Sequence, residues 1–120
     1  MKTERKILIG EDELLIAKVL RMLLEKQGFV VENVADGNEV FERALQMQPD
    51  VIILDLHLKN STCGLEAGKK IRAAGIETPI IFTTGNSYEI TLETVKEISC
   101  CSVMSKPVEF KKLLEVIHAL

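Results

Sequence analysis

Short apolar runs recur along this chain at a spacing that is typical of strands alternating with helices. The runs are rich in Ile, Val, Leu and Phe, and they cover residues 6–10, 29–34, 50–55, 79–84 and 100–104. Residues 51–54 are apolar without a break, as expected of a parallel strand that is buried on both faces. The run at 29–34 contains Glu32 and Asn33 and fits the edge of a sheet better.

The segments between these runs have the periodicity of helices. Apolar residues spaced by three and four predict helices within residues 12–27, 40–47, 65–74, 90–98 and 110–120. Gly28 and Gly75 follow the first and third of these segments, where a glycine commonly ends a helix. Met22, Met47 and Met104 are expected in the core.

Five strands that alternate with five helices predict an α/β fold of the (βα)5 type. Connections of this kind favour a parallel sheet with helices on both faces, a three-layer sandwich. The flavodoxin-like strand order 2-1-3-4-5 is the simplest expectation. The 120 residues are expected to form one domain, 1–120, with no output domain in this chain.

Composition narrows the class of protein. The chain is 47% hydrophobic and 28% charged, which suits a globular domain with an aliphatic core. A net charge of −3 argues against direct nucleic-acid binding, which normally needs a basic surface. Three cysteines do not form a disulfide framework, and no membrane span or leader peptide is evident, so a cytoplasmic location is expected.

Polar residues gather at the predicted carboxyl ends of the strands, where open parallel sheets bind ligands. Glu11 and Asp12 follow the first strand, and Asp55 ends the third. Thr84 ends the fourth, and Lys106 follows the fifth. Because the first and third strands are expected to be neighbours, three carboxylates should meet there, opposite a hydroxyl and an ammonium group.

This grouping predicts a site for a hard cation. Carboxylates that lie close together repel one another unless a cation neutralises them, and an all-oxygen set of ligands suits Mg²⁺, or Mn²⁺ in its place. With a lysine and a hydroxyl nearby, the same arrangement could stabilise a phosphoryl group on Asp55, since carboxylates act as nucleophiles in phosphoryl transfer. Each residue taken alone has a plainer explanation as a helix cap, a strand former or a surface lysine.

The segments ILIGEDE, DVIILDLHL, PIIFTTG and SKP together resemble the receiver domain of bacterial two-component response regulators, including the chemotaxis regulators. The resemblance covers essentially the whole chain. It implies that Asp55 is the phosphoacceptor, and that Asp12 and Asp55 contact Mg²⁺ directly while Glu11 does so mainly through water. It also implies that Thr84 is the switch hydroxyl and that Lys106 binds the phosphoryl oxygens, with a cis bond before Pro107.

Two further residues follow from the resemblance. His57 would offer its backbone carbonyl to the metal, while its side chain, together with Asn86, would line the phosphorylation site and tune the access of water. The chain departs from the family at Val103, where an aromatic residue is usual, and at Gly10, where a β-branched residue is usual.

The function implied is that of a phosphoacceptor signalling domain. It would catalyse its own phosphorylation and dephosphorylation without being a turnover enzyme. The expected partners are a sensor histidine kinase or phosphotransfer protein and a downstream protein that binds the face formed by the fourth helix, the fifth strand and the fifth helix. A homodimer is left open, and no contact with a membrane is expected.

The sequence leaves three alternatives open. A pseudo-receiver would bind its partners without phosphorylation, and the change at Val103 keeps this open. An aspartyl phosphohydrolase usually has a second aspartate two residues after the first, where this chain has His57. A flavodoxin-like nucleotide binder would need a phosphate-binding loop after the first strand, where this chain has the acidic sequence GEDE.

Overall fold

The computed structural model describes residues 5–58, 63–85 and 87–120, with only the backbone described for 88–90. Five strands and five helices alternate along it: β1 Lys6–Gly10, α1 Leu14–Lys26, β2 Val30–Val34, α2 Gly37–Met47, β3 Val51–Asp55, α3 Gly64–Ala73, β4 Ile80–Thr84, α4 Tyr88–Val95, β5 Cys101–Ser105 and α5 Phe110–His118. The predicted alternation is confirmed, and the ends of most elements differ from the expected ones by one to three residues. None of the helices in the described ranges has the length and apolar character that a membrane span requires.

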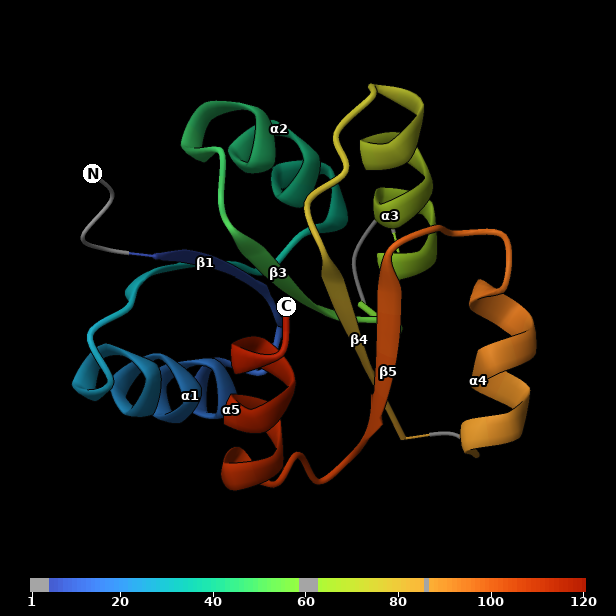
Figure 1. The fold of residues 1–120 in the computed structure, drawn as a ribbon. Coiled ribbons are helices and arrows are strands. Elements are labelled where there is room, and N and C mark those ends of the chain that lie inside the picture. Colours follow the sequence, from blue (N-terminus) through green and yellow to red (C-terminus); the bar gives the residue numbers. More distant parts are fainter. Residues whose placement is uncertain (1–4, 59–62, 86) are drawn as a thin grey trace.

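The strands form one parallel sheet in the order β2-β1-β3-β4-β5, as predicted. Of the three inner strands, β3 and β4 are buried along their whole length and β1 is buried except at Lys6, whereas the edge strands β2 and β5 are partly exposed. Helices α1 and α5 cover one face of the sheet, and α2, α3 and α4 cover the other (Figure 1). This is the expected three-layer sandwich.

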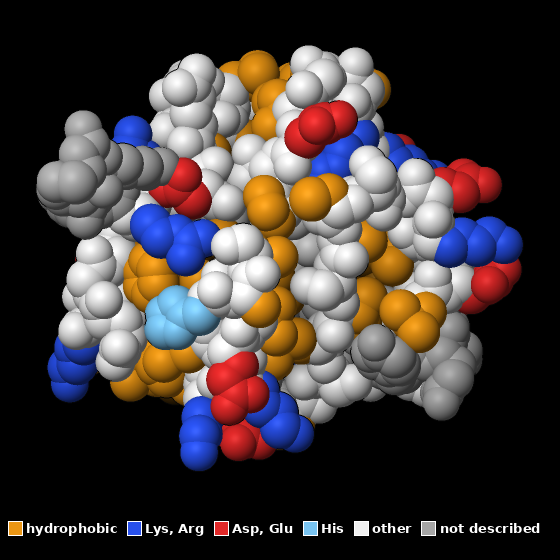
Figure 2. Space-filling view, in the orientation of Figure 1, with side chains coloured by type: hydrophobic (Ala, Val, Ile, Leu, Met, Phe, Trp, Pro, Cys, Tyr) orange, Lys and Arg blue, Asp and Glu red, His pale blue; other side chains and the backbone are white. Residues whose placement is uncertain are grey.

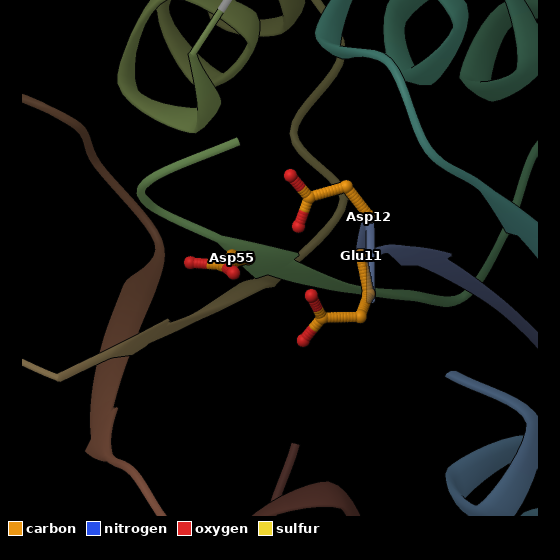
Figure 3. Close-up of side chains that lie close together, drawn as sticks. All are labelled: Glu11, Asp12 and Asp55. Carbon is orange, nitrogen blue, oxygen red and sulfur yellow. The ribbon is translucent and has the colours of Figure 1, made fainter. Parts of the chain in front are cut away.

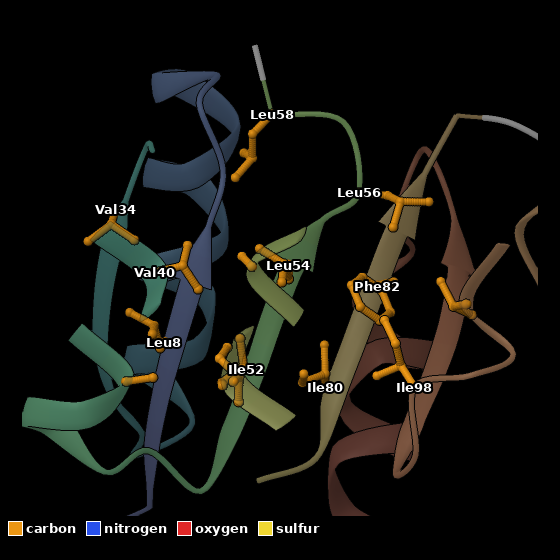
Figure 4. Packing of buried hydrophobic residues seen from close by; sticks show 14 of the residues in the cluster. Leu8, Val34, Val40, Ile52, Leu54, Leu56, Leu58, Ile80, Phe82 and Ile98 are labelled. Carbon is orange, nitrogen blue, oxygen red and sulfur yellow. The ribbon is translucent and has the colours of Figure 1, made fainter. Parts of the chain in front are cut away.

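Alternate residues of each strand pack into two separate cores. Leu8, Ile52, Leu54, Ile80 and Phe82 point toward α2, α3 and α4, and none of the five is more than 1% exposed (Figure 4). The other face presents Ile7, Ile9, Val51, Ile53 and Ile81 to α1 and α5. The period-two alternation of strand side chains therefore supplies an aliphatic layer to both sides of the sheet.

The helix ends follow the local chemistry of their sequences. Asp36 caps α2, because its carboxylate accepts a 2.8 Å hydrogen bond from the Asn38 backbone amide. Gly28 and Gly75 have φ of 96° and 81°, in the left-handed region that glycine enters without steric cost. Both glycines follow a helix, as the sequence predicts.

Helix α1 departs from the sequence-based expectation. Its apolar stripe predicts burial, yet Leu14 and Leu15 are each 74% exposed. Met22, expected in the core, is 49% exposed, so that prediction is wrong. The physical reason is that apolar residues occur around most of the circumference of α1, and a helix resting on a sheet can bury only one side. Met47 is buried as predicted, and Met104 packs partly buried against the core under α1 and α5.

Candidate functional site

The parallel sheet brings the carboxyl ends of β1, β3, β4 and β5 to the same edge. Glu11 and Asp12 follow β1 directly, and the Glu11 backbone amide donates a 3.0 Å hydrogen bond to the Val34 carbonyl at the end of β2. Asp55 is the last residue of β3, and it lies across from Glu11 and Asp12 (Figure 3). Glu11 and Asp55 are each only 5% exposed. The sequence-based prediction that these carboxylates meet is confirmed.

The three carboxylates form a compact group of oxygen ligands. One oxygen each from Glu11, Asp12 and Asp55 lies within 4.8 Å of the others. Such a set, without sulfur or nitrogen ligands, fits Mg²⁺ or Mn²⁺. Three carboxylates and one neighbouring ammonium group carry a formal charge of about −2, which a divalent cation balances. The side chains present therefore fit the expected metal.

Lys106 lies beside this group. Its Nζ donates to Asp55 Oδ2 at 2.7 Å and lies 3.4 Å from Glu11 Oε1. Burial alone would lower the pKa of Lys106, but the hydrogen bond to Asp55 and the charges of Asp55 and Glu11 outweigh it, so that the pKa is raised. Lys106 is therefore a fixed positive charge, held against the carboxylate expected to accept the phosphoryl group.

At Glu11, in contrast to Lys106, burial outweighs the favourable interactions of the charged form. Its burial raises the pKa of its carboxyl group. The Glu13 backbone amide, which donates to Glu11 Oε2 at 3.1 Å, and the Lys106 ammonium both oppose that rise without cancelling it. A buried carboxylate whose charged form is disfavoured gains from a nearby cation, so the direction of this pKa shift agrees with a metal at this edge.

Two features of the surroundings of Asp55 were not predicted from the sequence. The His57 amide donates to Asp55 Oδ1 at 2.9 Å, while the His57 residue as a whole is exposed. Gly64 lies so close that a Cβ atom there would come within 2.1 Å of the Asp55 carbonyl oxygen. A glycine shortly after the acceptor turn was the available signal for this close approach, but its target depends on the folded structure.

The other residues predicted for the site come from the ends of β4 and β5. Thr84 is the last residue of β4 and is fully buried, and its carbonyl accepts a 2.7 Å hydrogen bond from the Lys106 amide. Thr83 lies on the opposite side of the strand, facing a groove beside α1. The bond between Lys106 and Pro107 is cis, which confirms that expectation. Asn86 lies outside the described residues.

Comparison with known proteins agrees with this geometry. The family model of the response regulator receiver domain matches residues 7–118, so the chain belongs to this family, whose members act in two-component systems. The transcriptional regulatory protein DltR of Streptococcus agalactiae is 34% identical over 113 residues, which are 94% of this chain and 50% of that protein. The chain therefore spans about half the length of the curated relatives it matches.

Solved structures share the fold. The chemotaxis response regulator CheY4 of Vibrio cholerae superposes with a TM-score of 0.88 at 27% identity, over 98% of both chains. The receiver domain of the Francisella response regulator 1452 superposes with a TM-score of 0.87 at 25% identity, over 96% of this chain and 94% of that one. Both neighbours confirm the receiver fold that the strand order defines.

Proposed function

We propose that this receiver domain is phosphorylated on Asp55 in the presence of Mg²⁺, by a sensor histidine kinase or a phosphotransfer protein. The observation that carries the proposal is the position of Asp55. Its carboxylate is almost buried, belongs to a group of three carboxylates within 4.8 Å, and accepts a 2.7 Å hydrogen bond from Lys106 Nζ. A structural aspartate at the end of a strand would not need all of these features together.

In the proposed reaction an oxygen of the Asp55 carboxylate attacks the phosphorus atom of a phosphohistidine. The new P–O bond forms as the P–N bond to the imidazole breaks, and the electron pair stays on the imidazole nitrogen. Lys106 would shift from the carboxylate to a phosphoryl oxygen, and the Thr84 hydroxyl would donate to another. A divalent ion bound by Glu11, Asp12, Asp55 and the His57 carbonyl would supply further positive charge for the phosphoryl oxygens.

The proposed product changes the charge at the end of β3. A phosphoryl group adds roughly −1.5 to −2 charge and new acceptor oxygens. Lys106 follows β5 and Thr84 ends β4, so their movement toward the phosphoryl oxygens would be transmitted to α4, β5 and α5. This face would then change its affinity for a downstream protein. Val103, buried in the middle of β5, takes the place of the aromatic residue that usually accompanies the threonine.

Dephosphorylation would take place at the same site. Water would attack the aspartyl phosphate and release inorganic phosphate, and His57 together with Asn86 would control its approach. The domain would then return to its starting state without turning over a separate substrate. The relatives named as transcriptional regulators suggest that the downstream event is control of transcription.

The first test is chemical phosphorylation. Incubation with acetyl phosphate and Mg²⁺ is expected to add one acid-labile phosphoryl group, seen by intact-protein mass spectrometry, and removal of Mg²⁺ by EDTA is expected to abolish the addition. Asp55→Asn should show no addition. Asp36→Asn is the matched control, because an asparagine at this helix cap preserves the side-chain acceptor and lies outside the three-carboxylate group.

An unmodified wild-type protein under these conditions would contradict the proposal and favour the pseudo-receiver. Addition that persists in Asp55→Asn would place the acceptor elsewhere. Release of phosphate from a generic phosphoester with multiple turnovers would instead favour a phosphohydrolase.

A further inference from the structure

The edge strand β5 has little apolar burial of its own to fix its position. Of its five residues only Val103 is buried, whereas all five residues of β4 are buried. Cys101 and Met104 are partly buried against the two cores. No other element lies over β5 in Figure 1, and Figure 2 shows backbone and uncharged polar groups, drawn white, at the surface in this part of the molecule. Because the side chains that a strand buries specify its register, the apolar pattern specifies the register of β5 only weakly.

An arginine of α3 supplies a second constraint at the start of β5. The Arg72 side chain donates four hydrogen bonds to backbone carbonyls. Nε donates to Ser99 at 2.9 Å and Nη2 to Cys100 at 3.1 Å, both in the connection that leads into β5. Nη1 donates to Ile76 and Nη2 to Thr78, each at 2.8 Å, both in the connection that leads into β4. One planar group therefore holds the entries of two paired strands in a fixed relation.

The guanidinium group is itself held in place. Arg72 belongs to the last turn of α3, and Ala67 and Ile71 of this helix are fully buried in the core. The Cys100 carbonyl, which accepts from Arg72, also accepts a 3.1 Å hydrogen bond from the backbone amide of Ile80, the first residue of β4. Arg72 therefore binds the chain at the point where the pairing of β4 with β5 begins.

We propose that Arg72 sets the register of β5 against β4 and in this way positions Lys106 for Asp55. Lys106 directly follows the last residue of β5, and its Nζ donates to Asp55 Oδ2 at 2.7 Å. Since a strand advances about 3.3 Å per residue, a shift of β5 by two residues would move Lys106 by roughly 7 Å and break this contact. A shift by one residue would turn Val103 out of the core. The inference rests on the proposed function, in which Lys106 binds the phosphoryl group.

Amide hydrogen exchange of the unphosphorylated protein tests the constraint on β5. Arg72→Gln keeps a polar side chain but cannot reach both connections, so the β5 amides should exchange several-fold faster while the β3 amides stay protected. Arg72→Lys keeps the charge without the branched donors and should fall between this variant and the wild type. Arg43→Gln is the matched control, because Arg43 pairs with Glu32 on the other edge strand, β2. It should leave the exchange of β5 unchanged.

The rate of phosphorylation by acetyl phosphate and Mg²⁺ tests the consequence for Lys106. Arg72→Gln should be phosphorylated several-fold more slowly than the wild type, and Arg43→Gln at the wild-type rate. In a Lys106→Ala background Arg72→Gln should have little further effect, because the side chain that it positions is gone. A general loss of structure would instead slow phosphorylation equally with and without Lys106. Circular dichroism verifies that the variants are folded, and Arg72→Lys replaces Arg72→Gln if the latter is not.

Three results would overturn the inference. They are an unchanged exchange of the β5 amides in the Arg72 variants, an unchanged rate of phosphorylation, and a reduction of that rate that is equally large in the Lys106→Ala background. A wild-type protein that accepts no phosphoryl group would contradict the proposed function instead, and the exchange rates would still decide whether Arg72 holds β5 in register.

Discussion

The two faces of the sheet are covered to different degrees. On one face, α2, α3 and α4 enclose a core that includes Val40, Ile71 and Phe82, all fully buried. On the other face, α1 and α5 enclose a smaller core and leave the 640 Å³ groove between them open. We call these the closed face and the open face.

The two faces differ in how much of their apolar surface contributes to the packing of the domain. Leu24, Leu113 and Ile117 hold α1 and α5 to the open face and are fully buried, so the helices are well anchored despite the groove. The exposed leucines of α1 add nothing to this packing. Substitutions on the closed face should therefore lower stability, whereas substitutions on the exposed side of α1 should leave it nearly unchanged.

The largest effect is expected from matched phenylalanines. Phe82 on the closed face is fully buried, and Phe110 on the open face is only partly buried. Phe82→Ala should lower the free energy of unfolding by about 3–5 kcal/mol, because it removes a ring and leaves a cavity. Phe110→Ala should cost roughly half as much or less, since the groove already gives water access to that ring.

Urea denaturation of dilute protein, monitored by circular dichroism, measures both losses in the monomer. Equal losses for the two variants would show that the open face is packed as tightly as the closed one, and the contrast would be wrong.

A smaller loss of stability is expected from a substitution at Gly10, where side chains of the closed face leave little room for a Cβ atom. A Cβ atom there would lie 2.6 Å from Leu54 Cδ1 and 2.9 Å from Val40 Cγ2. Gly10→Val places at this position the kind of β-branched residue that is usual in the family, yet it should cost about 1–3 kcal/mol here through overpacking. The Leu54 methyl can rotate away, but the short Val40 side chain cannot.

Two controls separate crowding from a general effect of replacing glycine. Gly85→Ala should change the free energy of unfolding little, because a Cβ atom there meets nothing within 4 Å. Val40→Ala combined with Gly10→Val should recover part of the loss, as a double-mutant cycle would show. Additive losses in that cycle would rule out the Val40 contact as the cause.

Much of this arrangement could be predicted from the sequence. The alternation of apolar runs with helical segments predicted a parallel sheet, for which the flavodoxin-like strand order was the simplest expectation. That order predicted that Glu11, Asp12 and Asp55 would meet near Lys106. These predictions succeeded because alternating strands and helices leave few topologies, and a parallel sheet brings all strand ends of one kind to one edge.

Other features depended on packing that no local pattern reports. The stripe on α1 predicted a helix correctly, but not that Leu14 and Leu15 would be exposed, because periodicity does not say how much of a helix its neighbours can cover. The approach of Gly64 to the Asp55 carbonyl oxygen joins segments on either side of the acceptor turn. The distance between Gly64 and the Asp55 carbonyl oxygen depends on the position of α3 on the sheet.

The smallest effect concerns two adjacent cysteines at the start of β5, which test how well the closed face excludes reagents. Cys100 is exposed, whereas Cys101 is partly buried against the closed-face core, and its Sγ donates to the Ile98 carbonyl at 3.2 Å. Burial raises the pKa of the Cys101 thiol, and the nearby charge of Arg72 opposes this only in part. Because the thiolate is the reactive form, Cys101 should be alkylated more slowly than Cys100 at mildly alkaline pH.

The alkylation rate of Cys101 should rise only at higher pH, as its thiolate forms. Iodoacetamide labelling followed by peptide mass mapping gives both rates, and in urea the two thiols should react alike. Equal rates in the folded protein would mean that reagents reach this edge of the closed face as freely as solvent reaches Cys100.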